Sequence, residues 1–183
     1  MQLTDQQTLP VSQDIAWAAL NDLDLLREAI AGCESIAPVP GTENEYDVAL
    51  MATIGPVKAR FTGKMRMAEM NPPTSYQLQF EAKAAAGHGK GTARVSLTAL
   101  GANETRLDYE VQASVGGKLA QIGSRLVDMA AQKMAADFFE KLRTLLAARH
   151  GVPEAAPSVA EAAPAGAGVF ARLVAWIRRL FGA

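Results

Sequence analysis

The strongest constraint on the fold is a run of helix-forming residues from Gly116 to Arg149. The run has no proline, its glycines lie near its start, and it is rich in Ala, Leu, Met, Gln and Lys. We therefore predict one continuous helix of about 45 Å. Its buried face is predicted from the helical spacing of Leu119, Ile122, Leu126 and Met129, and Asp128 is expected to face solvent. Such a helix has to cover a second layer of structure.

The apolar stripe of this helix does not keep one direction. In its second half the apolar positions are Met134, Phe138, Leu142 and Leu145, which lie about a quarter turn away from the first set. We therefore expect two slightly different packing faces along one helix.

The residues before the helix predict a sheet, because apolar and polar side chains alternate with a period of two. Five segments show the alternation, at 45–52, 57–67, 76–83, 92–99 and 106–115. The pattern is typical of an antiparallel sheet with one covered face and one wetted face. The stretch Gly87–Gly91 is interpreted as a hairpin connection between two of these strands.

The start of the chain completes the fold prediction. Residues 2–9 predict a strand that ends at Pro10, and short helices are expected after Ser12 and from Asp22. The order of elements is that of a helix-grip fold of the α+β class, in which a curved antiparallel sheet wraps around the C-terminal helix.

The covered face of the predicted sheet has many small side chains: Ala52, Ala59, Gly63, Ala82, Ala93, Ala99 and Ala113. Two interpretations stay open. The small residues either admit large neighbours into an ordinary core, or they leave an apolar pocket between sheet and helix. The pocket walls, and the predicted ligand-binding residues, would be Tyr46, Phe61, Met65, Tyr76, Phe80, Leu97, Tyr109, Ile122, Leu126 and Met129.

The same face offers no pattern typical of a catalytic or metal site. We identify no carboxylate pair, no nucleophile beside a base and no cluster of metal ligands, so we predict no catalytic residue and no metal. A ligand in such a pocket would be hydrophobic, and the tyrosine hydroxyls could mark a carbonyl or quinone oxygen.

Composition narrows the classes of partner and compartment. The chain has 183 residues and a net charge of −1, so it has no basic excess for a nucleic acid. Its single Cys33 cannot form an internal disulfide. The first residues lack the pattern of a secretory signal, and no run is long enough to span a membrane, so we expect a cytoplasmic location.

The last part of the sequence changes character after residue 150. Residues 151–168 are Ala, Pro and Gly with two glutamates, which predicts a flexible linker. Residues 169–183 predict an amphipathic helix with Val169, Phe170, Leu173, Val174, Trp176, Ile177, Leu180 and Phe181 on one face and Arg172, Arg178 and Arg179 on the other. Aromatic residues opposite arginines favour a helix that lies on an anionic membrane surface, and docking on a partner protein or on its own domain is the alternative.

Several ordered motifs resemble the carbon monoxide dehydrogenase G-subunit family, within the START-like (SRPBCC) superfamily of helix-grip proteins. They are AGCESI, GPVKARFTGKM, TSYQLQFEAKAAAGHGKGTARVSL, ETRLDYEVQASVGGKLAQIGSRLVD and FFEKL, and they cover about residues 1–150. One departure is Ala31, where family members commonly have proline.

The resemblance implies a non-enzymatic accessory protein of a carbon monoxide dehydrogenase-type molybdenum hydroxylase. Such a protein would recruit the enzyme to the inner face of the cell membrane as a peripheral protein, and its cavity would suit a respiratory quinone or other isoprenoid lipid, with no covalent cofactor. A pure membrane scaffold without a ligand remains an alternative. A START-like enzyme that acts on a hydrophobic substrate is another.

Overall fold

The structure is a computed structural model that describes residues 1–150, so the predicted linker and amphipathic helix lie outside the described residues. The elements in chain order are β1 (Gln2–Leu9), α1 (Gln13–Leu20), α2 (Leu23–Ala29), β2 (Cys33–Pro38), β3 (Glu45–Ile54), β4 (Val57–Asn71), β5 (Ser75–Ala84), β6 (Gly87–Gly101), β7 (Glu104–Gly116), α3 (Lys118–Gln121) and α4 (Ser124–His150). Among these residues no helix is long and apolar enough to cross a membrane.

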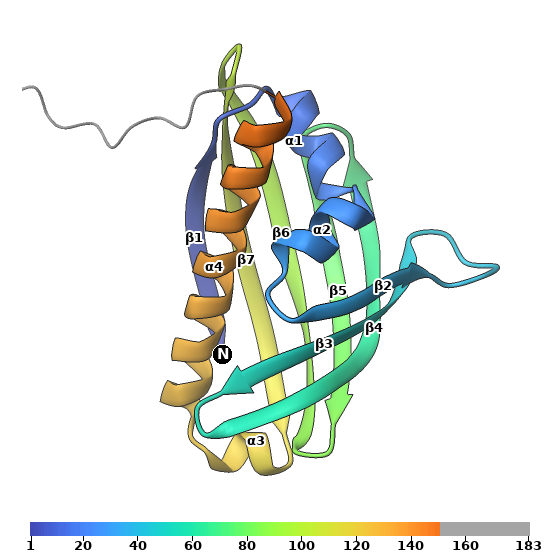
Figure 1. Cartoon of the computed structure of the whole chain (residues 1–183), viewed down its shortest axis with the longest axis vertical. Helices are drawn as coiled ribbons and strands as arrows, with labels where there is room; N and C mark the ends of the chain where they lie inside the picture. Colours follow the sequence, from blue (N-terminus) through green and yellow to red (C-terminus); the bar gives the residue numbers. More distant parts are fainter. Residues whose placement is uncertain (151–183) are drawn as a thin grey trace, which may run out of the picture.

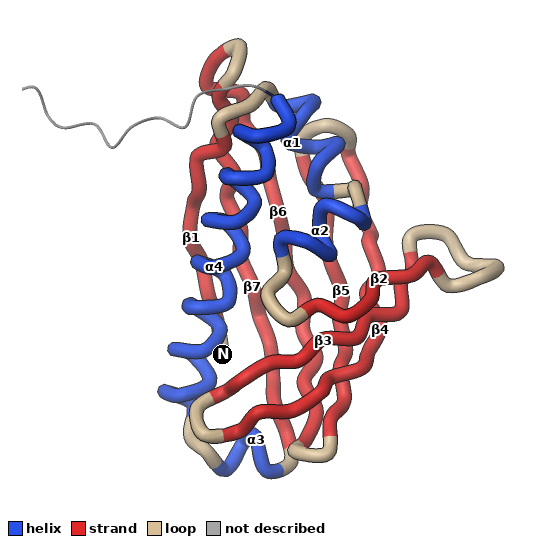
Figure 2. Tube along the Cα trace, viewed as in Figure 1, coloured by secondary structure: helices blue, strands red, loops and turns tan. Residues whose placement is uncertain are grey.

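The strands form one antiparallel sheet, and the helices lie against its inner face (Figure 1). Its seven strands are ordered β1-β7-β6-β5-β4-β3-β2, so consecutive strands pair except where β1 pairs with β7. Figure 2 shows α4 running along the β1 and β7 side of the sheet, with α1 and α2 beside its C-terminal half. The predicted curved antiparallel sheet with a long C-terminal helix is therefore confirmed.

Local sequence explains how the two short helices begin. The Ser12 hydroxyl accepts a hydrogen bond from the backbone N–H of Ile15, at 3.5 Å, and so caps α1. The Asp22 carboxylate accepts from the N–H groups of Asp24 and Leu25 and so caps α2. Both capping residues coincide with the predicted helix starts.

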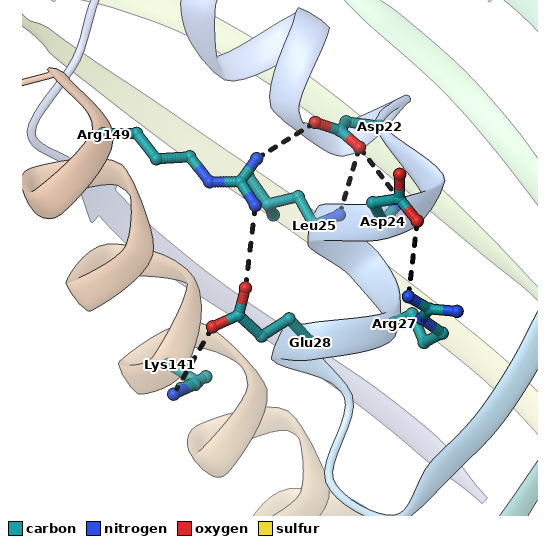
Figure 3. Close-up of polar contacts among 7 residues, drawn as sticks. All are labelled: Asp22, Asp24, Leu25, Arg27, Glu28, Lys141 and Arg149. Carbon is teal, nitrogen blue, oxygen red and sulfur yellow. Dashed lines mark hydrogen bonds and ion pairs between the residues drawn. The ribbon is translucent and has the colours of Figure 1, made fainter.

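Ion pairs join α2 to the last turns of α4 (Figure 3). Arg149 lies 3.1 Å from Asp22 and 3.6 Å from Glu28, and Lys141 lies 4.0 Å from the same glutamate. These contacts fix the end of α4 from which the chain continues to residue 151.

The prediction of one continuous helix from Gly116 to Arg149 is wrong. The strand β7 extends to Gly116, a four-residue α3 follows, and α4 begins only at Ser124. Gly117 and Gly123 have φ values of +72° and +94°, which L-residues with a side chain rarely adopt. These two glycines therefore break the helix that the composition favoured.

The hairpin connection predicted at Gly87–Gly91 is also misplaced. The turn falls at Ala85 and Ala86, and Gly87–Gly91 is the first part of β6, paired with both β5 and β7. A tight fit explains Gly91, because a Cβ at this position would clash with the carbonyl oxygen of Gln112.

Candidate functional site: the interior between sheet and helix

The apolar core is divided into two separate clusters. The larger one lies among α1, α2, the second half of α4 and the sheet, and its completely enclosed members include Leu9, Leu25, Leu107, Leu142 and Leu146. The smaller one lies at the α3 end and has only three buried members, Ala52, Phe61 and Leu119. A chain of this size can form one continuous core, so the division calls for an explanation.

Between the clusters lies a row of inward positions at the middle of the sheet. The strand register places Tyr46, Met65, Phe80, Gly91 and Ala113 side by side across β3 to β7. Met65, Phe80 and Ala113 belong to neither cluster, and all three are half-buried. Apolar side chains at the centre of a covered sheet are normally fully packed. Their partial exposure indicates that the interior is incompletely filled at this level.

The opposite wall has small side chains as well. In the first half of α4 the buried or half-buried positions are Val127, Asp128, Ala130, Ala131, Ala135 and Asp137. Phe138 and Phe139 come next and pack with the larger cluster, where Phe139 stacks on Tyr109 with ring centroids 5.1 Å apart. The helix therefore offers little volume over the middle row and large rings beyond it.

Two predicted wall residues on α4 do not face the interior. Leu126 is 40% exposed and Met129 is 56% exposed, so the predicted helix face is wrong for both. The physical reason is the break at Gly123, which separates Leu119 and Ile122 from α4 and leaves the second-half stripe with Phe138 and Leu142 to set its buried side.

The other predicted wall residues lie on the inner side of the sheet or next to α3. Phe61 belongs to the smaller cluster, and Tyr76, Leu97 and Tyr109 belong to the larger one. Tyr46, Met65 and Phe80 are half-buried in the middle row, and Ile122 is half-buried just before the break. The structure thus brings Tyr46, Met65 and Phe80 together around the unfilled level, with the four buried residues above and below it.

Asp128 is the polar residue that sequence reasoning misplaced. Its Oδ1 atom is buried and has no hydrogen-bond partner among the described residues, although the helical pattern had predicted a solvent-facing side chain. A buried carboxylate oxygen normally has a partner, because desolvation without a hydrogen bond is unfavourable. The signal that could have found it is the quarter-turn shift of the stripe, which places Asp128 on the side of Phe139 and Leu142.

Burial raises the pKa of two inner tyrosines. Desolvation raises the pKa of Tyr76, whose ring meets Trp17 edge to face at 5.7 Å. Desolvation also raises the pKa of Tyr109, and the adjacent Asp5 raises it further. A phenol with its ordinary pKa of 10 is already protonated at neutral pH, and these shifts move both pKa values further above neutrality.

The smaller cluster closes the α3 end of the interior. Leu119 is 1% exposed, and its backbone N–H donates to the carbonyl of Ala86 at 3.0 Å. It sits on a four-residue helix bounded by the two positive-φ glycines, Gly117 and Gly123. The closing element is thus a short segment with little packing of its own.

A groove of about 990 Å³ lies along the middle of the sheet. Its lining combines the middle-row residues Met65, Phe80, Gly91 and Ala113 with polar neighbours that include Lys64, Arg66, Glu81 and Lys90. Opposite charges alternate across the strands here, since Lys64 pairs in register with both Asp47 and Glu81. Such cross-strand pairs stabilise a solvated sheet surface.

The chain matches one protein family in sequence and several solved structures in fold. Residues 6–147 match the family model described as the G subunit of carbon monoxide dehydrogenase (CoxG). A conserved protein from Geobacillus kaustophilus has a similar structure, with 27% identity, a TM-score of 0.77, and coverage of 81% of this chain and 96% of that one. Among curated proteins no sequence matches significantly.

More distant structures share the fold. The Zhui aromatase/cyclase from Streptomyces sp. R1128 has 10% identity and a TM-score of 0.64, over 82% of this chain and 95% of that one. A START superfamily protein from Mycobacterium smegmatis has 11% identity and a TM-score of 0.62, over 81% and 98%. These similarities establish a START-like fold and by themselves say nothing about activity.

Proposed function

The chain belongs to the carbon monoxide dehydrogenase G-subunit (CoxG) family, and we propose that it is a non-catalytic, membrane-tethered accessory protein that holds a hydrophobic ligand for a molybdenum-containing oxidoreductase. The observation that carries the proposal is the divided core. Half-buried Met65, Phe80 and Ala113 leave an apolar, incompletely filled level between two packed clusters. Apolar space with few polar groups is typical of sites for greasy ligands.

The ligand that we propose is a respiratory quinone or a similar isoprenoid lipid. Oxidation of carbon monoxide with water gives carbon dioxide, two protons and two electrons, and a quinone that takes up all four becomes a quinol. A protein that encloses a quinone would let the oxidised form leave the bilayer and the reduced form return to it. Neutral tyrosine hydroxyls would donate hydrogen bonds to the carbonyl oxygens of the quinone, and the buried carboxylate oxygen of Asp128 would accept one from a hydroxyl of the quinol.

The membrane part of the proposal is based on the sequence of residues 151–183. A tether of 18 residues has a root-mean-square span of roughly 25 Å, which would let the domain move while Trp176, Phe181 and the arginines hold the inner membrane surface. The same tail would bring the oxidoreductase and the quinone pool close together, which raises their effective concentration.

The test is to identify what the full-length protein carries. We expect organic extraction of gently purified protein, or native mass spectrometry, to release an isoprenoid quinone. Ala113→Phe should displace that ligand by filling the middle row, whereas Ser114→Phe, which adds an aromatic ring to the outer face of the same strand, should retain it. An empty protein that also fails to bind added decylubiquinone would favour the pure scaffold.

An enzymatic role is the second alternative, because one structural neighbour is an aromatase/cyclase. To distinguish a carrier from an enzyme, the ligand-bound protein is incubated alone, and the mass of the extracted ligand is then measured. An unchanged ligand mass supports the carrier, and a time-dependent change of mass supports an enzyme.

A further inference from the structure

The end of the molecule that carries α3 differs in charge from the rest of the chain. Three segments meet there: 53–60 at the β3–β4 turn, 83–88 at the β5–β6 turn, and 116–126 around α3. They contain no Asp or Glu, although the whole chain has 18 Lys and Arg against 19 Asp and Glu. Their basic residues are Lys58, Arg60, Lys83, Lys118 and Arg125.

Specific contacts hold these three segments together. The hydrogen bond from Leu119 to Ala86 joins α3 to the β5–β6 turn. A Cβ built on Gly55 would lie 3.5 Å from Leu126 and 3.7 Å from Ile122, so the β3–β4 turn touches the junction of α3 and α4. Figure 1 shows this end of the molecule opposite the C-terminus of α4.

The surface of this end combines exposed apolar side chains with uncompensated cations. Leu126 and Met129, 40% and 56% exposed, project from the first turns of α4. Lys58, Lys118 and Arg125 are exposed and make no ion pair among the described residues. Within residues 1–150 seven Lys and Arg residues form ion pairs, and Arg60 of this end is one of them. Unpaired cations such as Lys64 and Lys90 also lie elsewhere in this range, so what distinguishes this end is that its three segments contain no Asp or Glu.

We propose that this α3 end, defined by residues 53–60, 83–88, 116–126 and Met129, is a second membrane-contact surface, carried by the folded domain itself and facing anionic phospholipids. Large exposed apolar side chains gain free energy when they enter the acyl boundary, and surrounding lysines and arginines gain from anionic head groups. Segments 53–60, 83–88 and 116–126 contain no acidic residue. Of the acidic residues next to them, Asp128 has a buried Oδ1 atom and Glu34 is paired with Arg60 at 2.6 Å. The inference extends the proposed function, because the ligand would come from the bilayer.

The position of the surface also gives it a role in ligand exchange. The small cluster that closes the interior includes Leu119 of α3, a helix of four residues between two glycines. Insertion of Leu126 and Met129 into the membrane would place α3, the short segment that closes the interior, next to the bilayer. The tail would then keep the protein at the membrane, and the α3 end would determine how the domain is oriented on it.

The first experiment measures binding in the full-length chain with the tail face disabled by Trp176→Asp and Phe181→Asp. Vesicles of equal parts phosphatidylcholine and phosphatidylglycerol should still be bound, and pure phosphatidylcholine should be bound far less. Adding Lys58→Glu, Lys118→Glu and Arg125→Glu should weaken binding about tenfold or more, since each cation near an anionic surface is worth roughly fivefold. The control Arg27→Glu, Arg94→Glu and Lys133→Glu changes the net charge equally and should weaken it much less.

The second experiment reports contact directly, with the tail intact. Met129→Cys in a Cys33→Ser background is labelled with an environment-sensitive fluorophore, and Ala148→Cys serves as the control at the opposite end. We expect a blue shift on anionic vesicles at position 129 and none at 148. Vesicle binding without a shift at 129, or charge reversal without effect, overturns this proposal. Neither result affects the extraction test, so failure of the ligand proposal is recognised separately.

Discussion

Arg149 donates to Asp22 across 3.1 Å, while the other oxygen of the same carboxylate caps α2 by accepting the N–H groups of Asp24 and Leu25 (Figure 3). One side chain thus fixes the start of α2 and connects it to the last turn of α4. The cap is the dominant part of this arrangement, because an exposed ion pair contributes little and a helix cap contributes more.

Separating the two roles gives a stability prediction. Asp22→Ala removes cap and ion pair and should lower the free energy of unfolding by about 1–2 kcal/mol. Asp22→Asn keeps a capping oxygen and should cost less than about 1 kcal/mol, the usual range for an exposed ion pair. Urea unfolding at neutral pH compares them, and equal losses would contradict the dominance of the cap.

The same carboxylate makes a prediction about pH. The hydrogen bond from the Leu25 backbone, with further help from Asp24 and Arg149, lowers the pKa of Asp22 below its ordinary value of 3.8. A lowered folded-state pKa stabilises the protein fully above that ordinary value, and the contribution is lost as the pH falls through the folded-state pKa. Unfolding free energies measured below pH 5 should therefore fall less steeply for Asp22→Asn than for the unchanged protein.

The middle row predicts which apolar residue matters for a ligand. Phe80→Asp should abolish retention of an apolar probe such as decylubiquinone, because it places a charge between Met65 and the backbone of Gly91. Leu126→Asp should leave retention largely unchanged, because Leu126 is exposed on α4. Equilibrium binding followed by fluorescence quenching compares the two, and melting curves control for unfolding. An equal loss of probe binding in both variants would show instead that the α4 face with Leu126 lines the site, as the sequence predicted.

Most of the fold could be predicted from the sequence because its signals are local. The period of two in the strands, the caps at Ser12 and Asp22, and the proline after β1 each act within a few residues. The division of the core could not be predicted in this way. Whether Met65 or Phe80 is fully packed depends on how far α4 stands from the sheet, and that distance is set by contacts between remote parts of the chain.

The helix face differs from its prediction for a related reason. Composition over a long window favoured one helix, but two positive-φ glycines outweighed it and reset the phase of the stripe. The shift at Phe138 and Leu142 is visible in the sequence, and a face drawn through these two residues has Asp128 inside and Leu126 outside. A single glycine can therefore decide which face of a helix forms a site.

The helix break gives a prediction of its own. Gly123→Ala should lower the free energy of unfolding by about 1–2 kcal/mol, because a residue with a side chain is strained at a φ of +94°. No atom lies within 4 Å of the position that its Cβ would occupy, so the loss would come from the backbone alone. Gly123→Asn should cost less, since asparagine tolerates positive φ better. Urea unfolding of the two variants measures the difference, and equal stability of Gly123→Ala and the unchanged protein would show that the break has no strain.

The tail can be tested independently of the domain. Removing residues 169–183 should strongly reduce flotation of the protein with anionic liposomes but leave the weaker binding expected of the α3 end, and the melting temperature of the domain should hardly change. The reason is that the predicted membrane-binding residues, such as Trp176 and Phe181, lie beyond the described elements and none is needed to build the sheet or α4. A large drop in melting temperature would instead favour docking of residues 169–183 on the domain.

Asp128 provides a test of whether a residue that lowers the stability of the fold also contributes to ligand binding. Its Oδ1 is buried without a partner among the described residues, so replacing it should relieve a desolvation cost. We expect Asp128→Leu to raise the free energy of unfolding of the ligand-free protein by about 0.5–1 kcal/mol, as measured in urea. The same change should weaken binding of 4-nonylphenol, whose hydroxyl can donate to the carboxylate, and should leave binding of 4-nonylanisole, which cannot donate, nearly unaltered. Asp128→Asn keeps the shape and an accepting oxygen and should therefore lose less of the preference for the phenol. If the leucine variant is less stable and binds both probes as before, Asp128 is a structural residue of α4 and the interior has no polar point at this position.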